Sequence, residues 1–167
     1  EATLDPALAR EPVFWTPDEA LPAGARFLVT TRIGGVSEGP FATLNLGLRV
    51  GDKDSAVHEN VRRVRDALGA EEPAPLRVRQ VHGTALVDAA ALRQRPPDAA
   101  LPAADGILLA AGDPWCAVSV ADCAPVALVA ASGRRGALVH SGWRGTLDGI
   151  AVRAALELEH GGDPPES

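Results

Sequence analysis

Methionine and tyrosine are absent from this chain of 167 residues, and lysine occurs once, as Lys53. The absence of tyrosine excludes catalysis by a tyrosyl group, and the absence of methionine excludes metal ligation by a thioether. Arginine therefore supplies nearly all of the positive charge, a bias that reflects codon usage more than chemistry.

Cysteine is also scarce, with Cys116 and Cys123 as the only two. Two thiols cannot make a disulfide-rich scaffold, and without a visible signal peptide we expect them to be reduced. No apolar run is long enough to cross a bilayer, and no charged leader with a hydrophobic segment and a cleavage site is visible. These absences predict a cytoplasmic protein with no membrane partner.

Positive charge is outnumbered by negative charge, and the formal net charge is -6. Because contacts to phosphates need a basic surface, this balance argues against a nucleic-acid partner. A chain of this length with 46% hydrophobic residues predicts one compact domain with a real core. We expect residues 1–24, rich in Ala, Pro and Glu, to form a loosely attached N-terminal segment, and residues 25–167 to form the domain.

Strand-like segments outnumber helical ones. Apolar periodicity predicts a helix that has Asp52 or Asp54 as its N-cap and stops at Gly69. A second helix is expected after Thr146, with an inner face made of Leu147, Ile150, Ala151, Ala154 and Leu158. Short apolar runs bounded by turn residues predict strands at 26–32, 76–87 (interrupted near His82), 106–110, 115–120, 126–131 and 136–140. Because loops or hairpins join most of these strands, the predicted fold class is α+β.

Three strand-like segments each carry a histidine or a cysteine at an edge: His82, Cys123 and His140. Zinc accepts imidazole nitrogen and thiolate, and a catalytic zinc site typically has three protein ligands and one open position. The three residues are therefore candidate zinc ligands, although their separation in sequence neither supports nor opposes their convergence. In the alternative interpretation, the cysteine is a small buried hydrophobe and each histidine has an ordinary hydrogen-bond partner.

Six motifs occur in order over roughly residues 26–160, and together they resemble the YfiH family, which is also called the laccase-domain or polyphenol oxidase family. They are Thr30-Thr31-Arg32-Ile33-Gly34-Gly35-Val36-Ser37, Leu44-Asn45-Leu46-Gly47, Gln80-Val81-His82-Gly83, Ala104-Asp105-Gly106, Ala121-Asp122-Cys123-Ala124-Pro125 and His140-Ser141-Gly142-Trp143-Arg144-Gly145-Thr146. The number, order and spacing of these motifs make a chance match improbable.

The resemblance implies a two-layer mixed β core flanked by helices, and a zinc site made by His82, Cys123 and His140. It also implies activity on purine nucleosides: phosphorolysis of adenosine, inosine, guanosine and methylthioadenosine, and deamination of adenosine. Some family members are instead assigned as amidases that edit a peptidoglycan precursor. Relatives continue beyond the region of Gly162, so we expect this chain to lack the family's C-terminal portion, and an inactive zinc-binding module is a further alternative.

Other residues of the motifs have chemistry that suits such a site. Asp122 is a candidate for proton transfer, or for accepting a histidine N–H. Arg144 and Arg32 can clamp phosphate through bidentate hydrogen bonds, or form structural ion pairs. Gln80 and Asn45 suit recognition of a purine edge or the fixing of a loop. Trp143 can stack on a base, or simply pack.

The laccase label can be tested by counting histidines. By resemblance to true laccases, a multicopper oxidase needs about ten histidines, because copper centres of this kind are rich in imidazole. This chain has four, so true laccase chemistry is excluded. A single blue-copper site uses the same two-histidine, one-cysteine set, but its usual axial methionine cannot exist here. We therefore predict a colourless zinc protein, with copper as the minor alternative.

Overall fold

The computed structural model describes residues 12, 14–16, 21–22, 25–48 and 50–160. The chain divides into two compact units, one made by Phe27–Ala74 with Glu1–Asp18 and the other by Pro75–Ser167 with Glu19–Arg26. The predicted N-terminal segment, residues 1–24, lies mostly outside the described residues, and the prediction of a single domain over residues 25–167 stays a prediction.

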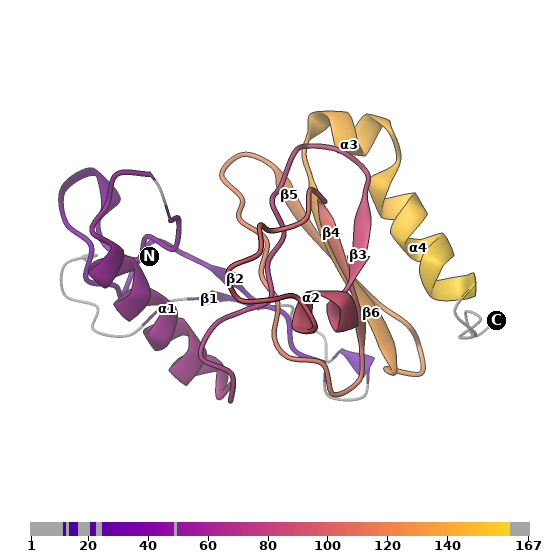
Figure 1. Cartoon of the computed structure of the whole chain (residues 1–167), viewed down its shortest axis with the longest axis horizontal. Helices are drawn as coiled ribbons and strands as arrows, with labels where there is room; N and C mark the ends of the chain where they lie inside the picture. The colour runs from indigo at the N-terminus through magenta and orange to yellow at the C-terminus, as the bar shows by residue number, and fades with distance from the viewer. Residues whose placement is uncertain (1–11, 13, 17–20, 23–24, 49, 161–167) are drawn as a thin grey trace, which may run out of the picture. The chain divides into compact units, whose positions relative to one another are not determined.

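The first unit contains a two-stranded antiparallel sheet, a short 3-10 helix and one long α-helix (Figure 1). The strands are β1 (Phe14–Trp15) and β2 (Val29–Thr30), and the helices are η2 (Gly39–Phe41) and α1 (Asp54–Leu68). The prediction that α1 stops at Gly69 is confirmed: this glycine has a left-handed φ of 64°, and its N–H donates to the carbonyls of Arg65 and Asp66.

The predicted cap of α1 is wrong, because Lys53 occupies the N-cap position and makes no side-chain capping bond. The Asp52 carboxylate instead accepts hydrogen bonds from Ser37 Oγ at 2.6 Å and Asn45 Nδ2 at 2.9 Å. These bonds hold the loop before the helix, so the aspartate stabilises that loop rather than the helix terminus.

Asn60 joins α1 to the same loop. Its side chain is fully buried and donates through Nδ2 to Ser37 Oγ at 2.9 Å and to the Asn45 carbonyl at 2.8 Å, while Oδ1 accepts the Val36 N–H at 2.8 Å. An amide is both donor and acceptor, so one asparagine satisfies several backbone groups that no regular element pairs.

The second unit is built on a mixed four-stranded sheet with the order β3-β4-β6-β5. Its strands are β3 (Leu86–Asp88), β4 (Gly106–Ala110), β5 (Ala124–Val129) and β6 (Arg135–Ser141). Strands β3 and β4 are parallel, whereas β6 pairs antiparallel with both β4 and β5. This mixed sheet with its flanking helices confirms the predicted α+β class, and β4 has the predicted bounds.

Three helices accompany this sheet: α2 (Ala89–Arg93), α3 (Trp143–Leu147) and α4 (Ile150–His160) (Figure 1). Helix α4 packs Ile150 and Ala154 against one face of the sheet, in a cluster that includes Leu108 and Val139. Ile107, which precedes Leu108 on β4, belongs to a second cluster with Ala89 and Leu92 of α2. Because neighbouring strand residues point to opposite faces, both faces of β4 are covered.

The predicted strand at 115–120 is wrong, since only Cys116 forms a bridge there, with Leu76. Further along, the Gln80 side chain takes the place of a strand partner. Its Nε2 donates to the Ser119 carbonyl at 2.8 Å, and its Oε1 accepts the Ser119 N–H at 2.7 Å. Because the Gln80 side chain already pairs with the N–H and carbonyl groups of Ser119, these groups do not require a neighbouring strand.

The final helix also departs from the prediction, because it is divided into α3 and α4 by Gly149, which has a left-handed φ of 77°. Thr146 lies inside α3 and donates its hydroxyl to the Gly142 carbonyl at 2.9 Å rather than capping a helix. The break changes the direction of the helical faces: Ile150, Ala154 and Leu158 are buried as predicted, but Leu147 is 80% exposed.

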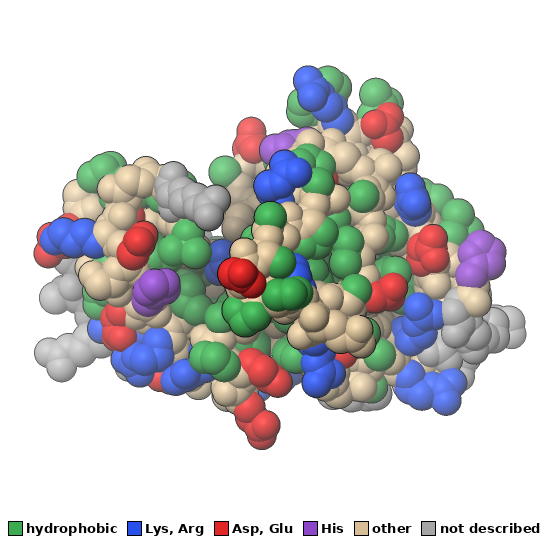
Figure 2. Space-filling view, viewed as in Figure 1, with side chains coloured by type: hydrophobic (Ala, Val, Ile, Leu, Met, Phe, Trp, Pro, Cys, Tyr) green, Lys and Arg blue, Asp and Glu red, His purple; other side chains and the backbone are tan. Residues whose placement is uncertain are grey.

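Acidic and basic side chains are interspersed on the face drawn in Figure 2, rather than separated into a basic stripe. The absence of a nucleic-acid partner, inferred from the net charge of -6, stays a prediction. Among the described residues, no helix combines the length and the apolar character that crossing a bilayer requires.

Candidate metal centre

His82 lies in the loop before β3 and is held in an uncommon backbone conformation. Its φ of 61° falls in the left-handed region that L-residues rarely adopt. The Asp105 carboxylate accepts the N–H groups of Val81, His82 and Gly83, with distances of 2.9 Å to His82 and 2.7 Å to Gly83. The loop is therefore wrapped around a carboxylate, and the His82 side chain itself is exposed.

Cys123 comes directly before β5 and is half-buried. Its Sγ lies 3.6 Å from Oδ1 of Asp122. Burial raises the pKa of the Cys123 thiol, and the hydrogen bond to Asp122 and the negative charges of Asp122 and Asp105 raise it further. In this anionic surrounding, a cation is the natural counter-charge for the thiolate.

His140 is the penultimate residue of β6 and is almost completely buried, with 3% of its surface exposed. Its Nδ1 lies 2.8 Å from Oδ1 of Asp105, and its backbone N–H donates to the Asp105 carbonyl at 2.7 Å. The ring is thus fixed from the Nδ1 side, which leaves Nε2 as its second nitrogen for another partner.

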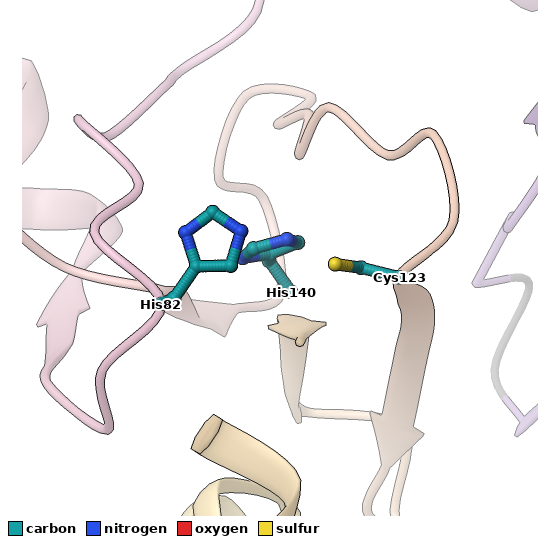
Figure 3. A group of neighbouring side chains, drawn as sticks. All are labelled: His82, Cys123 and His140. Carbon is teal, nitrogen blue, oxygen red and sulfur yellow. The ribbon is translucent and has the colours of Figure 1, made fainter. Parts of the chain in front are cut away.

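The structure brings these three side chains together, and Figure 3 shows them directed toward one another. Their ligand atoms all lie within 4.8 Å of one another, and the two imidazole rings meet edge to face with centroids 4.8 Å apart. Two imidazoles and one thiolate form a donor set that suits zinc or copper. The group can therefore hold a metal ion.

The turn after His140 passes close to the three donors because it contains a glycine. At Gly142, a Cβ atom would lie 2.8 Å from His82 Cδ2, 3.3 Å from Cys123 Sγ and 3.6 Å from His140 Cε1. At Gly145, a Cβ would lie 2.9 Å from the Gly83 carbonyl oxygen. The start of α3 is thus packed against the loop that carries His82.

Asp105 is the residue of this centre to which we assigned no role from the sequence. It is fully buried and lies directly before β4. Burial by itself would raise the pKa of its carboxyl, but hydrogen bonds from His140 and from the N–H groups of Gly83, His82 and Val81 outweigh burial and hold that pKa below its usual range. A carboxylate between Ala104 and Gly106, just before an apolar strand, is the sequence signal that could have identified it.

The two predicted catalytic residues, Asp122 and Arg144, are both exposed. Asp122 contacts Cys123 as described above. Arg144 is in α3, where its guanidinium carbon lies 5.0 Å from the centre of the Trp143 ring. Trp143 is itself 69% exposed, so its ring is not a core residue.

The remaining predicted binding residues have hydrogen bonds to backbone groups of this chain. Gln80 pairs with the backbone of Ser119, as described for the fold. Arg32 and Asn45 belong to the other unit, where Arg32 Nε donates to the Ala42 carbonyl at 2.8 Å and Asn45 Oδ1 accepts the Gly47 N–H at 3.0 Å. These bonds fix loops, and the substrate-binding roles of the three residues stay predictions.

Comparison with known proteins adds a family. A family profile described as multi-copper polyphenol oxidoreductase laccase matches residues 26–166. The chain is 40% identical over 148 residues to a purine nucleoside phosphorylase of Pseudomonas aeruginosa, which covers 89% of this chain and 57% of that protein. It is also 40% identical over 134 residues to the purine nucleoside phosphorylase YlmD of Geobacillus stearothermophilus, covering 77% of this chain and 48% of the relative.

Solved structures support the same relationship. A Neisseria meningitidis protein superimposes with a TM-score of 0.75 at 36% identity, over 87% of this chain and 57% of that one. The structure of YlmD from Geobacillus stearothermophilus gives a TM-score of 0.73 at 33% identity, over 89% and 59% of the two chains. This chain therefore spans about half to three fifths of the length of these relatives. On this match, the chain belongs to the multi-copper polyphenol oxidoreductase laccase family, the YfiH family of the sequence motifs.

Proposed function

We propose that this chain carries the metal centre of a zinc-dependent purine nucleoside phosphorylase. The observation that carries the proposal is the convergence of His82, Cys123 and His140, whose ligand atoms lie within 4.8 Å of one another in a family whose relatives bear that name.

Zinc fits this donor set better than copper. Nitrogen and thiolate ligands are those that zinc prefers, and three protein ligands leave one position of a tetrahedron for substrate. The chain contains no methionine for the axial position of a blue-copper site. When bound there, zinc would act as a Lewis acid toward an oxygen or a leaving group.

The side chains beside the centre support a substrate with an aromatic base and an anion. Trp143 offers an exposed indole for stacking on a purine, and the Arg144 guanidinium next to it offers two parallel donors to phosphate. Adenosine, inosine, guanosine and methylthioadenosine are the proposed nucleosides. In phosphorolysis the bond between the ribose C1′ and the base nitrogen breaks, a bond from C1′ to a phosphate oxygen forms, and the base leaves with a proton.

Asp122 is the proposed proton-transfer group for that departing base. Its carboxyl is exposed and lies against Cys123, so it borders the open side of the centre. Deamination of adenosine, in which water replaces the amino group and ammonia leaves, is the second activity included in this proposal.

The test combines metal analysis with product analysis. We expect about one zinc ion per purified chain, as a three-ligand site requires, and no intense absorption near the red end of the visible spectrum. Inosine should give hypoxanthine and ribose 1-phosphate only when phosphate is present. A full-length relative serves as the positive control, because this chain spans 57% of the Pseudomonas protein.

A matched pair of cysteine variants makes the test specific. Cys123→Ser should lose zinc and activity together, whereas Cys116→Ser should retain both, since Cys116 packs against an apolar cluster. Zinc-loaded protein that leaves adenosine and inosine intact would contradict the proposed activity. Release of an amino acid from a peptidoglycan precursor without phosphate would favour the amidase alternative.

A further inference from the structure

We propose that Asp105 is a positioning residue that presents both histidines, His82 and His140, to the metal. The proposal rests on the metal centre of the proposed function but does not depend on the substrate. Asp105 is neither a metal ligand in the group nor a residue that touches substrate: it acts through the two histidines, one by its ring and one by its backbone.

The first contact fixes the tautomer of His140. Oδ1 of Asp105 lies 2.8 Å from His140 Nδ1, and both side chains are buried, at 0% and 3% exposure. An ionised carboxylate only accepts hydrogen bonds, so the proton of the neutral imidazole is placed on Nδ1. The lone pair of Nε2 is then available to bind a metal, as in the carboxylate–histidine–zinc arrangement of many zinc sites.

The second contact fixes the backbone of His82. Oδ1 accepts the His82 N–H at 2.9 Å, Oδ2 accepts the Gly83 N–H at 2.7 Å, and the Val81 N–H lies 3.1 Å from Oδ1 and 3.2 Å from Oδ2. These bonds hold a residue whose φ of 61° is unfavourable for an L-amino acid. Without these hydrogen bonds, we expect the loop to relax from this conformation and His82 to turn away from His140.

Only a carboxylate satisfies all of these partners. Four N–H groups, three from the backbone and one from His140, converge on two oxygens in a buried position. An asparagine would place its NH₂ group either against the Gly83 N–H or, after rotation, against the N–H groups of His82 and His140. In the second orientation the amide donates to Nδ1 and moves the imidazole proton to Nε2, which blocks metal ligation.

Three measurements test the proposal without any nucleoside. The variant is Asp105→Asn, and the control is Asp98→Asn, which removes an exposed carboxylate from the loop after α2. Long-range proton–nitrogen correlation spectra of the metal-free protein report the tautomer of His140. Competition with a chelator reports zinc affinity, and the visible spectrum of the cobalt-substituted protein reports the coordination geometry.

We expect the Nδ1–H tautomer of His140 in the wild type and in Asp98→Asn. Asp105→Asn should bind zinc about 10- to 100-fold more weakly and give an altered cobalt spectrum, and it should lose the Nδ1–H tautomer where its amide nitrogen faces His140. A purely structural role would lower thermal stability and leave the tautomer and the affinity of the folded protein unchanged.

Two results overturn the proposal: an Nε2–H tautomer in the metal-free wild type, or a folded Asp105→Asn variant that binds zinc as tightly as the wild type. If Asp105→Asn does not fold, the wild-type tautomer alone decides. A wild type that binds no zinc refutes the proposed zinc enzyme, while the tautomer still decides the role of Asp105. Loss of zinc affinity in a chain without nucleoside activity supports Asp105 and contradicts the proposed activity.

Discussion

Gly142 lies so close to His82 that a methyl group on its α-carbon would stand 2.8 Å from Cδ2 of the imidazole. The backbone at Gly142 has φ -72° and ψ 168°, an extended conformation that any residue adopts. Glycine is therefore required here by space rather than by the turn, because the chain passes within contact distance of the candidate metal ligands.

Gly142→Ala should weaken zinc binding. Overpacking of this kind typically costs about 1–3 kcal/mol, which corresponds to about 5- to 150-fold in affinity when the ligands must move apart. The matched control is Gly83→Ala in the loop that carries His82, because a Cβ there meets its nearest atom, Asp105 Oδ2, at an ordinary 3.6 Å. Chelator competition measures both variants, and equal zinc affinities for the two would contradict the spatial argument.

The three candidate ligands were identifiable from the sequence by residue type, but their convergence was not. His82, Cys123 and His140 belong to a loop, the start of an edge strand and the end of a central strand. Their proximity depends on the pairing of β6 with β4 and β5, which no local pattern encodes. The role of Asp105 could not be predicted for a related reason: it arises only when four N–H groups from two separate segments meet on one carboxylate.

The Cys116 thiol should react far more slowly in the folded protein than in the unfolded chain. Burial, followed by the charge of Asp113, raises the pKa of Cys116 from 9.0 to about 12, so at pH 8 the folded protein holds about a thousandfold less Cys116 thiolate than the unfolded chain. Alkylation by iodoacetamide, followed by mass spectrometry, should therefore modify Cys116 in urea and leave it intact in the native protein. Rapid native modification of Cys116 would show that this position opens to solvent.

Asn60→Ala should destabilise the unit that contains α1 by at least about 2 kcal/mol, because several buried polar groups lose their partner at once. The groups affected include Ser37 Oγ, the Asn45 carbonyl and the Val36 N–H. Urea unfolding measures the loss, and His58→Ala, an exposed change on the same helix, is the control. An unfolding free energy equal to that of the control would mean that water replaces the amide.

Glu59→Gln should reduce stability in a pH-dependent way. Hydrogen bonds from Arg62 and Arg63 lower the pKa of Glu59 from 4.5 to about 2. A folded-state pKa below the unfolded one stabilises the protein above pH 4.5, and this contribution disappears as the pH falls toward about 2. The difference from wild type should stay below about 1 kcal/mol at pH 7, as for partly exposed pairs, and shrink between pH 4.5 and 3. Urea unfolding measures it, with Glu157→Gln on α4 as control, and a difference that grows on acidification would contradict the assignment.

The regular elements that were predicted well are those that depend on local chemistry. Strand β4 has its predicted bounds, and Gly69 ends α1 through its left-handed conformation. The errors occur where a distant side chain or a break in a helix changes the structure that the local pattern predicts. Gln80 pairs with Ser119 where a strand was predicted, and the break at Gly149 leaves Leu147 exposed instead of buried.

The burial of the three candidate ligands is unequal, since His82 is exposed, Cys123 is half-buried and His140 is nearly inaccessible. This gradient sets an order for metal exchange. We expect an incoming chelator to meet the exposed His82 first, and an ion bound at this centre to leave His140, in the central strand, last. The loop that carries His82 should then set the rate of metal loss, while His140 in the sheet should be the last residue to hold the ion. Variants of the two histidines should therefore differ in exchange kinetics even where their equilibrium affinities match.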